Sequence, residues 1–161
     1  MGFISALTAI AALGASVSAV AADSFAKPEV IHYGATAAQT EKALEGMCTK
    51  RVTRPINPPF LDNVKRQQLQ IDCDGFPFMG KGRWAEFVIR DDKLEMVWMM
   101  VDADEQPAIV AAMEKTMGKP AITNGRYIAW PAQGAAWRFK PAEILFYGPG
   151  VADEAETWFV E

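Results

Sequence analysis

The stretch of sequence that decides the fold is residues 67–101, QQLQIDCDGFPFMGKGRWAEFVIRDDKLEMVWMMV. It opens with alternating polar and apolar side chains, so that Leu69, Ile71 and Cys73 fall on one side of an extended chain. Alternation with a period of two is typical of a strand that buries one face against a core. We therefore expect this stretch to begin with a half-buried strand.

The remainder of the stretch predicts two more strands. Residues 75–82 are rich in glycine and predict a turn, after which residues 83–90 predict a second strand. The pair Asp91-Asp92 predicts another turn, and the apolar run 94–101 is typical of a central strand. Successive strands joined by short turns pair as an antiparallel meander.

Upstream of the meander the sequence predicts a helix and then a long loop. Thr36-Ala37-Ala38-Gln39 has the Thr-x-x-Gln form of a capping box, and apolar side chains then recur at helical spacing as far as Cys48. Residues 49–63 contain three prolines, which disfavour a regular element. We expect this segment to be an ordered loop.

Downstream, a second helix is predicted with Asp104 as its N-cap, Pro107 in its first turn and Gly118 just after its end. Three further strands are predicted at residues 121–130, with a break at Asn124-Gly125 left open, at 135–140 and at 143–147. An acidic tail from Asp153 is compatible with a short final helix.

The predicted fold class is α+β. The order is helix, three strands, helix, three strands, which predicts an antiparallel sheet of about six strands with two helices on one face. The chain has 161 residues, of which 50% are hydrophobic and 22% charged, a balance that excludes a disordered chain. We expect residues 23–161 to form a single domain.

Residues 1–22 predict a secretory signal peptide. They contain no charged side chain and end in small residues that allow cleavage after Ala21 or Ala22. No Lys or Arg precedes the apolar run, so an uncleaved membrane anchor remains the alternative. With the signal removed we expect no transmembrane segment, and a periplasmic or secreted protein.

The exported part has two cysteines, Cys48 and Cys73, which predict one disulfide. The bridge would close a loop of about 25 residues, worth about 3 kcal/mol in the chain-entropy model. Two buried free thiols are the alternative. We expect no metal site, because two cysteines and His32 do not supply the usual four zinc ligands.

Charge is the strongest functional lead. The net charge of −4 argues against nucleic-acid binding, but residues 50–90 carry eight Lys or Arg against four acids. Arg and aromatic side chains are enriched at interfaces, which suggests an acidic protein partner or an anionic ligand in the cell envelope. A solvated basic surface is the alternative. The candidate binding residues are Arg51, Arg54, Phe60, Arg66, Arg83 and Trp84.

No catalytic residue can be named. After residue 22 the chain has one serine, Ser24, and one histidine, His32, which disfavours a Ser-His hydrolase, and nucleotide- or cofactor-binding motifs are lacking. We therefore expect no cofactor. Carboxylates cluster around Asp72, Asp91 and Asp102, and such groups serve acid and base chemistry or bind calcium where they meet.

Residues 70–76, with Gly80, Arg83, residues 85–88 and residues 94–98, resemble a family of small uncharacterised exported proteins of Gram-negative bacteria. The resemblance implies a periplasmic setting and no particular activity. The order of elements is also similar to the helix-and-sheet repeats of periplasmic inhibitor and outer-membrane assembly modules, in architecture only.

Two functions follow from these observations. The first is a periplasmic, non-enzymatic binding or protein-interaction module. The alternative is a small carboxylate-dependent enzyme of the hydrolase type, which requires two of the acidic clusters to share a pocket.

Overall fold

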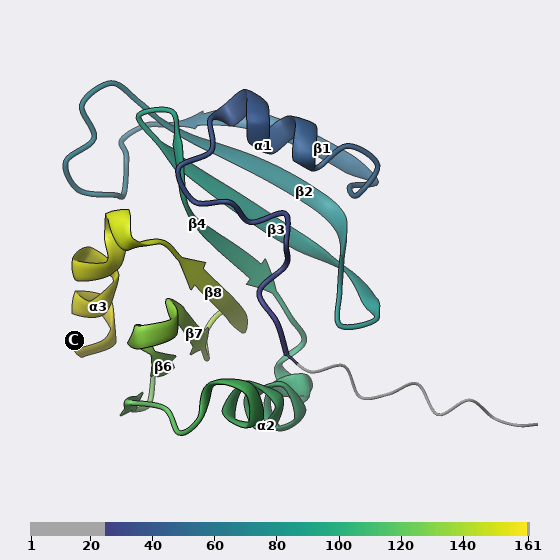
Figure 1. The fold of residues 1–161 in the computed structure, drawn as a ribbon, viewed down its shortest axis with the longest axis vertical. Helices are drawn as coiled ribbons and strands as arrows, with labels where there is room; N and C mark the ends of the chain where they lie inside the picture. The colour runs from purple at the N-terminus through teal and green to yellow at the C-terminus, as the bar shows by residue number, and fades with distance from the viewer. Residues whose placement is uncertain (1–24, 161) are drawn as a thin grey trace, which may run out of the picture.

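The computed structural model describes residues 25–160, so the predicted signal peptide lies outside the described residues. They form one antiparallel sheet of eight strands in the order β1-β2-β3-β4-β8-β7-β6-β5, with helices on both faces (Figure 1). Between residues 25 and 160, no helix is long and apolar enough to cross a membrane. The elements are α1 (Ala37–Ala43), β1 (Lys50–Ile56), β2 (Gln68–Phe78), β3 (Lys81–Arg90), β4 (Lys93–Met100), α2 (Gln106–Met117), β5 (Ile122–Thr123), β6 (Tyr127–Trp130), β7 (Ala135–Arg138), β8 (Glu143–Tyr147) and α3 (Ala152–Val160).

The α+β class and the antiparallel sheet are confirmed, but each half of the described chain contributes four strands rather than three, and the second half contributes two α-helices, α2 and α3. Strand β4 pairs with β8 in the middle of the sheet. The other strands follow outward on each side in reverse chain order. The second half gains its extra strand because the chain breaks at Asn124-Gly125, which separates β5 from β6.

In the first half the extra strand is β1, which corrects the expectation of a loop over residues 49–63. Strand β1 pairs with β2 only and forms an edge of the sheet. Its residues are almost all exposed, so no alternation of apolar and polar side chains marks it in the sequence. An edge strand also tolerates Pro55, because only one side of it has to donate hydrogen bonds. Residues 57–67 do form a loop.

Helices α1 and α2 pack on the same face of the sheet, as predicted. Leu44, just after α1, and Ile109 and Met113 of α2 belong to one buried cluster with the side chains of that face. Trp130 and Trp137, fully buried in the same cluster, provide much of its apolar area.

The acidic tail forms the short final helix with which its sequence is compatible, α3, but this helix lies on the opposite face, whereas the prediction placed helices on one face only. Val151, Ala155 and Phe159 pack there against Met96 and Leu145 of the central strands. Each central strand therefore buries both of its faces, as its continuous apolar sequence suggests. Helix α3 covers only part of this second face.

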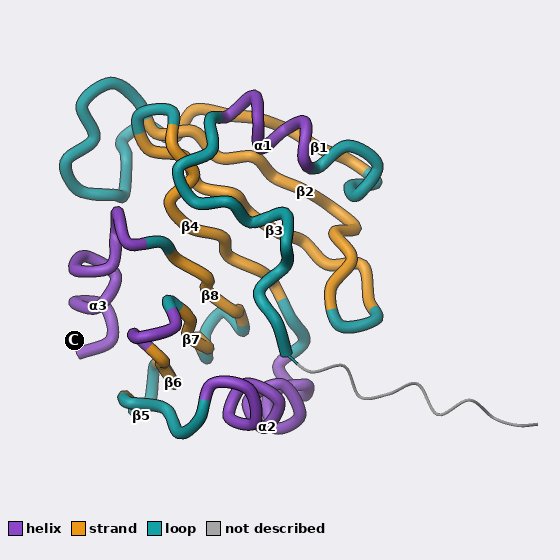
Figure 2. Tube along the Cα trace, in the orientation of Figure 1, coloured by secondary structure: helices purple, strands orange, loops and turns teal. Residues whose placement is uncertain are grey.

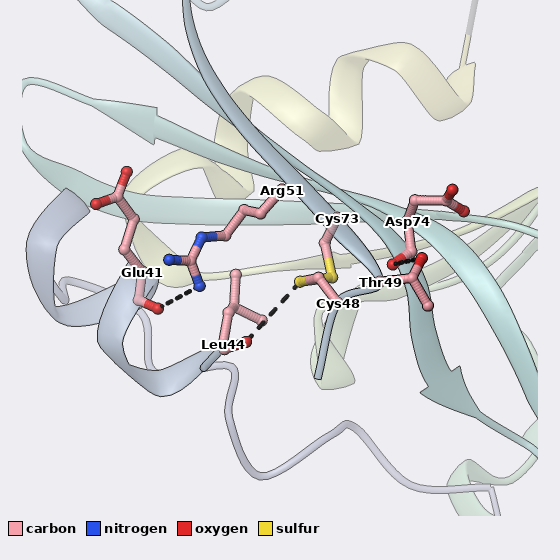
Figure 3. Close-up of a disulfide and its surroundings, with 7 residues drawn as sticks. All are labelled: Glu41, Leu44, Cys48, Thr49, Arg51, Cys73 and Asp74. Carbon is pink, nitrogen blue, oxygen red and sulfur yellow. Dashed lines mark hydrogen bonds between the residues drawn. A yellow bond between two sulfur atoms is a disulfide. The ribbon is translucent and has the colours of Figure 1, made fainter. Parts of the chain in front are cut away.

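The predicted disulfide is confirmed. Cys48, which follows α1, is bonded to Cys73 of β2 with an S–S distance of 2.03 Å (Figure 3). Thr49 lies next to the bridge, and its N–H donates to the carbonyl of Asp74 at 2.7 Å. The bridge and this bond attach the end of the first helix to the second strand of the sheet.

Candidate functional site

Three of the six candidate binding residues are held in contacts with separate parts of the chain. Arg51 Nη1 donates to a backbone carbonyl of α1 at 2.9 Å (Figure 3), and Arg66 Nη2 donates to the carbonyl of Asp91 at 2.7 Å. Arg83 donates twice to the Glu105 carboxylate, at 2.6 and 3.0 Å, and its side chain is only 4% exposed. These three arginines do not converge.

The other three lie together on the face of the sheet opposite α1 and α2. Arg54 Nε donates to Asp72 at 2.7 Å, and Trp84 Nε1 donates to Glu86 at 3.2 Å. Phe60, 47% exposed, lines a pocket that also contains Glu86. The structure therefore brings Arg54, Phe60 and Trp84 into one neighbourhood.

A row of directly paired residues runs across the sheet through this neighbourhood. Val52 is paired with Asp72, Asp72 with Glu86, Glu86 with Trp98, and Trp98 with Leu145. Directly paired residues point to the same face of a sheet. The row is apolar at Leu145, under α3, carries carboxylates at Glu86 and Asp72, and ends at the exposed Val52 of β1.

A pocket of about 370 Å³ lies on this face, and we call it the aromatic pocket. Its lining combines four aromatic rings with one carboxylate and one guanidinium group. Each lining residue comes from a different element, so the pocket requires the complete fold. The residues are Phe60 of the loop 57–67, Glu86 of β3, Trp98 of β4, Tyr127 of β6, Arg138 of β7 and Trp158 of α3.

Figure 2 shows the connection between β1 and β2 as a long loop. It is anchored at several points, and its Phe60 lines the pocket. The side-chain oxygen of Gln68 accepts the N–H groups of Phe60 and Leu61 at 3.1 and 3.0 Å. The Asp91 carboxylate accepts the N–H groups of residues 65–67 at 2.7 to 3.2 Å. These backbone hydrogen bonds hold the pKa of Asp91 below its ordinary value.

Two tryptophans and an arginine are stacked in the aromatic pocket. The rings of Trp98 and Trp158 are nearly parallel, at 20° with centroids 6.3 Å apart. The Arg138 guanidinium lies 4.1 Å from the centroid of Trp98 and also forms an ion pair with Glu143. Cation–π contacts of this kind favour placing a positive charge against a tryptophan ring.

Glu143 of β8 is paired directly with Arg138 of β7 and is almost completely buried. Burial raises the pKa of the Glu143 carboxyl, the positive charge of Arg138 opposes that rise, and the nearby Glu86 adds to it. Glu143 thus has its own cation in Arg138.

The charges on this face pair off and leave one carboxylate, among the described residues, without an ion pair. Arg54 pairs with Asp72, and Arg138 pairs with Glu143. Glu86 forms no ion pair with any residue between 25 and 160, and it accepts a hydrogen bond from the indole N–H of Trp84. The local charge is thus negative, and it is centred at the pocket.

Comparison with known proteins found no relative of this chain. Tested against models of protein families, curated proteins and solved structures, this chain matches none. The candidate site is therefore interpreted from its own residues.

Sequence reasoning missed five residues of the aromatic pocket: Glu86, Trp98, Tyr127, Arg138 and Trp158. Trp98 was expected in a central strand, which is correct, but its position suggested only a core residue. A usable signal was its spacing, because Trp98 alternates with the core residues Val97 and Met99 and so points to the other face. No sequence signal links Trp158 to this site.

The three acidic clusters of the sequence do not share a pocket. Asp72 is in the middle of β2 and buried, Asp91 is in the turn between β3 and β4, and Asp102 follows the opposite end of β4. Within residues 25–160, no group of three or more His, Cys, Asp or Glu side chains is arranged to hold a metal ion.

A larger hollow of about 880 Å³ lies between the loop 57–67, the β3–β4 turn and the start of α3. Arg90 crosses it and donates to the carbonyls of Asp62 and Gly150, at 3.0 and 2.6 Å. Arg90 also forms ion pairs with Glu95 and Glu154. Arg90 is engaged in joining these segments, so we assign Arg90 a structural role.

Proposed function

We propose that this protein is an exported, non-enzymatic binding module whose contact site is the aromatic pocket. The observation that carries the proposal is the convergence of Phe60, Trp98, Tyr127 and Trp158 with Glu86 and Arg138 around one pocket of about 370 Å³. Pockets that combine aromatic walls with a few placed polar groups are typical of ligand sites, and aromatic side chains with Arg are enriched at interaction hot spots.

An exported setting is supported by the disulfide. Cys48 and Cys73 are bonded, and disulfides persist in oxidising compartments such as the periplasm. The predicted signal peptide and the resemblance to exported proteins of Gram-negative bacteria point the same way. We therefore place the binding partner or ligand in the cell envelope.

Binding is favoured over carboxylate-dependent hydrolysis. The hydrolase hypothesis requires two acidic clusters in one pocket, whereas Asp72, Asp91 and Asp102 lie in separate places. Among the described residues that line the aromatic pocket, Glu86 is the single carboxylate, and Glu143, which pairs with Arg138, is buried and outside the lining.

The acidic partner suggested by the basic stretch 50–90 has weaker support. Arg51, Arg66 and Arg83 each donate to groups within the chain, and Arg54 is paired with Asp72. An anionic ligand would have to compete with these contacts. We accordingly propose the aromatic pocket, and not a basic surface, as the contact site.

Site-specific photocrosslinking tests the proposal. A benzophenone side chain placed at Phe60, on the rim of the pocket, should form an adduct in producing cells, visible by gel electrophoresis or intact-mass measurement. The matched control is Met47, which is also partly exposed (37% against 47%) but lies near the disulfide. Adducts at Met47 equal to those at Phe60, or none at Phe60, would reject the proposal.

A further inference from the structure

We infer that the aromatic pocket receives an organic cation, an ammonium or guanidinium head group that pairs with Glu86 and lies against the surrounding rings. The inference rests on the proposed function, because it names the chemistry of the ligand at the same pocket. It differs from the anionic ligand suggested by the local charge of the sequence.

The first step is the charge left on this face. Arg54 and Asp72 compensate each other at 2.7 Å, as do Arg138 and Glu143 in their ion pair. Among residues 25–160, Trp84 provides the one side-chain hydrogen bond to Glu86, from its indole N–H at 3.2 Å, and Glu86 lines the pocket. An incoming cation would form the ion pair with Glu86 that no described residue forms.

The second step is the aromatic lining. Tryptophan and tyrosine rings attract cations through the negative potential of their faces, most strongly where water is displaced. The pocket already holds one such contact, since the Arg138 guanidinium lies 4.1 Å from the centroid of Trp98. Phe60, Tyr127 and Trp158 provide further rings beside Glu86.

The same groups oppose an anion. A carboxylate or phosphate in the pocket would lie next to Glu86, and like charges at short distance disfavour each other. Arg138 is the one cation of the lining, and its charge is already engaged by Glu143. The electrostatic preference of the pocket is therefore for a positive group.

The size of the pocket limits what carries the cation. About 370 Å³ is close to the lower end of the range of ~300 to 1,000 Å³ that small-ligand pockets occupy. That volume suits a head group with a short linker. The cation is thus either the side chain of a Lys or Arg residue in a peptide or a small ammonium compound.

Nuclear magnetic resonance titrations test the inference on the purified chain with its disulfide intact. The indole N–H signals of Trp98 and Trp158 report binding. The cationic probes are choline, N-acetyl-lysine amide and N-acetyl-arginine amide. Their neutral counterparts are 3,3-dimethylbutanol and N-acetyl-norleucine amide. We expect saturable shifts of both signals with cations only, and the better cation identifies the source as a peptide side chain or a small ammonium compound.

Variants locate the charge that matters. Glu86→Gln keeps the size of the side chain and should weaken binding of the best cation about tenfold, as expected for one charge-assisted contact. Glu114→Gln makes the same change at an exposed position of α2 and should leave the affinity unchanged. Dispersed amide signals in both variants establish that they are folded.

Each other outcome has a definite meaning. Equal shifts with cations and neutral counterparts, or unchanged affinity in Glu86→Gln, would overturn the cation inference and leave the pocket as a binding site. Absence of any shift would overturn the inference too, and photocrosslinking from Phe60 would then decide separately whether the proposed function stands. If neither the titrations nor photocrosslinking from Phe60 gives a signal, the cation inference and the proposed function are both rejected.

Discussion

The Arg138 guanidinium lies over the ring of Trp98, 4.1 Å from its centroid, while it forms an ion pair with Glu143. One side chain of β7 thus contacts the two central strands, β4 and β8. Because Glu143 is buried, its negative charge depends on Arg138 for compensation. The pocket and the stability of the sheet are therefore linked through this arginine.

Replacing Arg138 by Met, which preserves the length of the side chain, should lower the free energy of unfolding by about 2 kcal/mol. The reason is that Glu143 would remain buried without a cation. Urea denaturation measures the loss. The double variant Arg138→Met with Glu143→Gln should recover part of it, and a loss equal to the sum of the two single variants would contradict the coupling.

Glu105 should give the protein a specific sensitivity to acid. Hydrogen bonds from Arg83 are the main cause that lowers the pKa of Glu105 from 4.5 to about 2. The unfolded chain, with its higher pKa, takes up the proton first as the pH falls. The stabilising contribution is therefore complete above about pH 4.5 and is lost as the pH falls towards 2.

Glu105→Gln tests this sign directly. The variant should show a flatter dependence of unfolding free energy on pH between about 4.5 and 2 than the natural chain. Urea denaturation at several pH values in that window provides the comparison. Parallel curves for the two proteins would show that the Arg83–Glu105 contact does not set the acid response.

Gly134 should be far less tolerant of substitution than Gly46. Both have positive φ angles, 60° and 75°, so alanine at either position pays the cost of a left-handed conformation, about 1 kcal/mol. At Gly134 the added Cβ would also overlap the carbonyl oxygen of Tyr147, whereas at Gly46 nothing lies within 4 Å. We expect Gly134→Ala to lose about 3 kcal/mol and Gly46→Ala about 1, measured by thermal or urea unfolding. Equal losses would mean that the neighbouring backbone yields at no cost.

Asp91 should control the loop that carries Phe60. Its carboxylate accepts the N–H groups of residues 65–67, so Asp91→Ala should speed hydrogen exchange of these amides about tenfold or more. The neighbouring Asp92 accepts instead from the N–H of Ala37 at 3.0 Å. Asp92→Ala is thus a matched control, and it should speed exchange at the start of α1 only. Exchange in the loop that is unchanged in Asp91→Ala would contradict the anchoring role.

Local patterns in the sequence predicted much of the fold. The alternation of Leu69, Ile71 and Cys73 predicted β2. The pair Asp91-Asp92 predicted the turn between β3 and β4, where both residues have positive φ. Gly118, with φ of 83°, ends α2 as expected. These signals succeed because burial and turn geometry constrain neighbouring residues directly.

The site could not be predicted in the same way. Trp98, Arg138 and Trp158 are far apart in the chain, and only the pairing of β4 with β8 and the docking of α3 bring them together. The excess of basic residues in the stretch 50–90 was visible, but the partners that engage Arg51 and Arg83 were not, since they come from α1 and from the turn before α2. Charge counts along a chain do not reveal which charges the fold pairs.

The seam between β4 and β8 has a mechanical consequence. Within residues 25–160 it is the one strand pairing that joins the two halves of the chain, and the aromatic pocket lies across it, with Glu86 and Trp98 on one side and Tyr127 and Arg138 on the other. A ligand that bridges these residues would act as a clamp. A force that pulls the two halves apart would then have to break the ligand contacts together with the pairing of β4 with β8. The ligand-bound protein should therefore resist mechanical unfolding more strongly than the free protein.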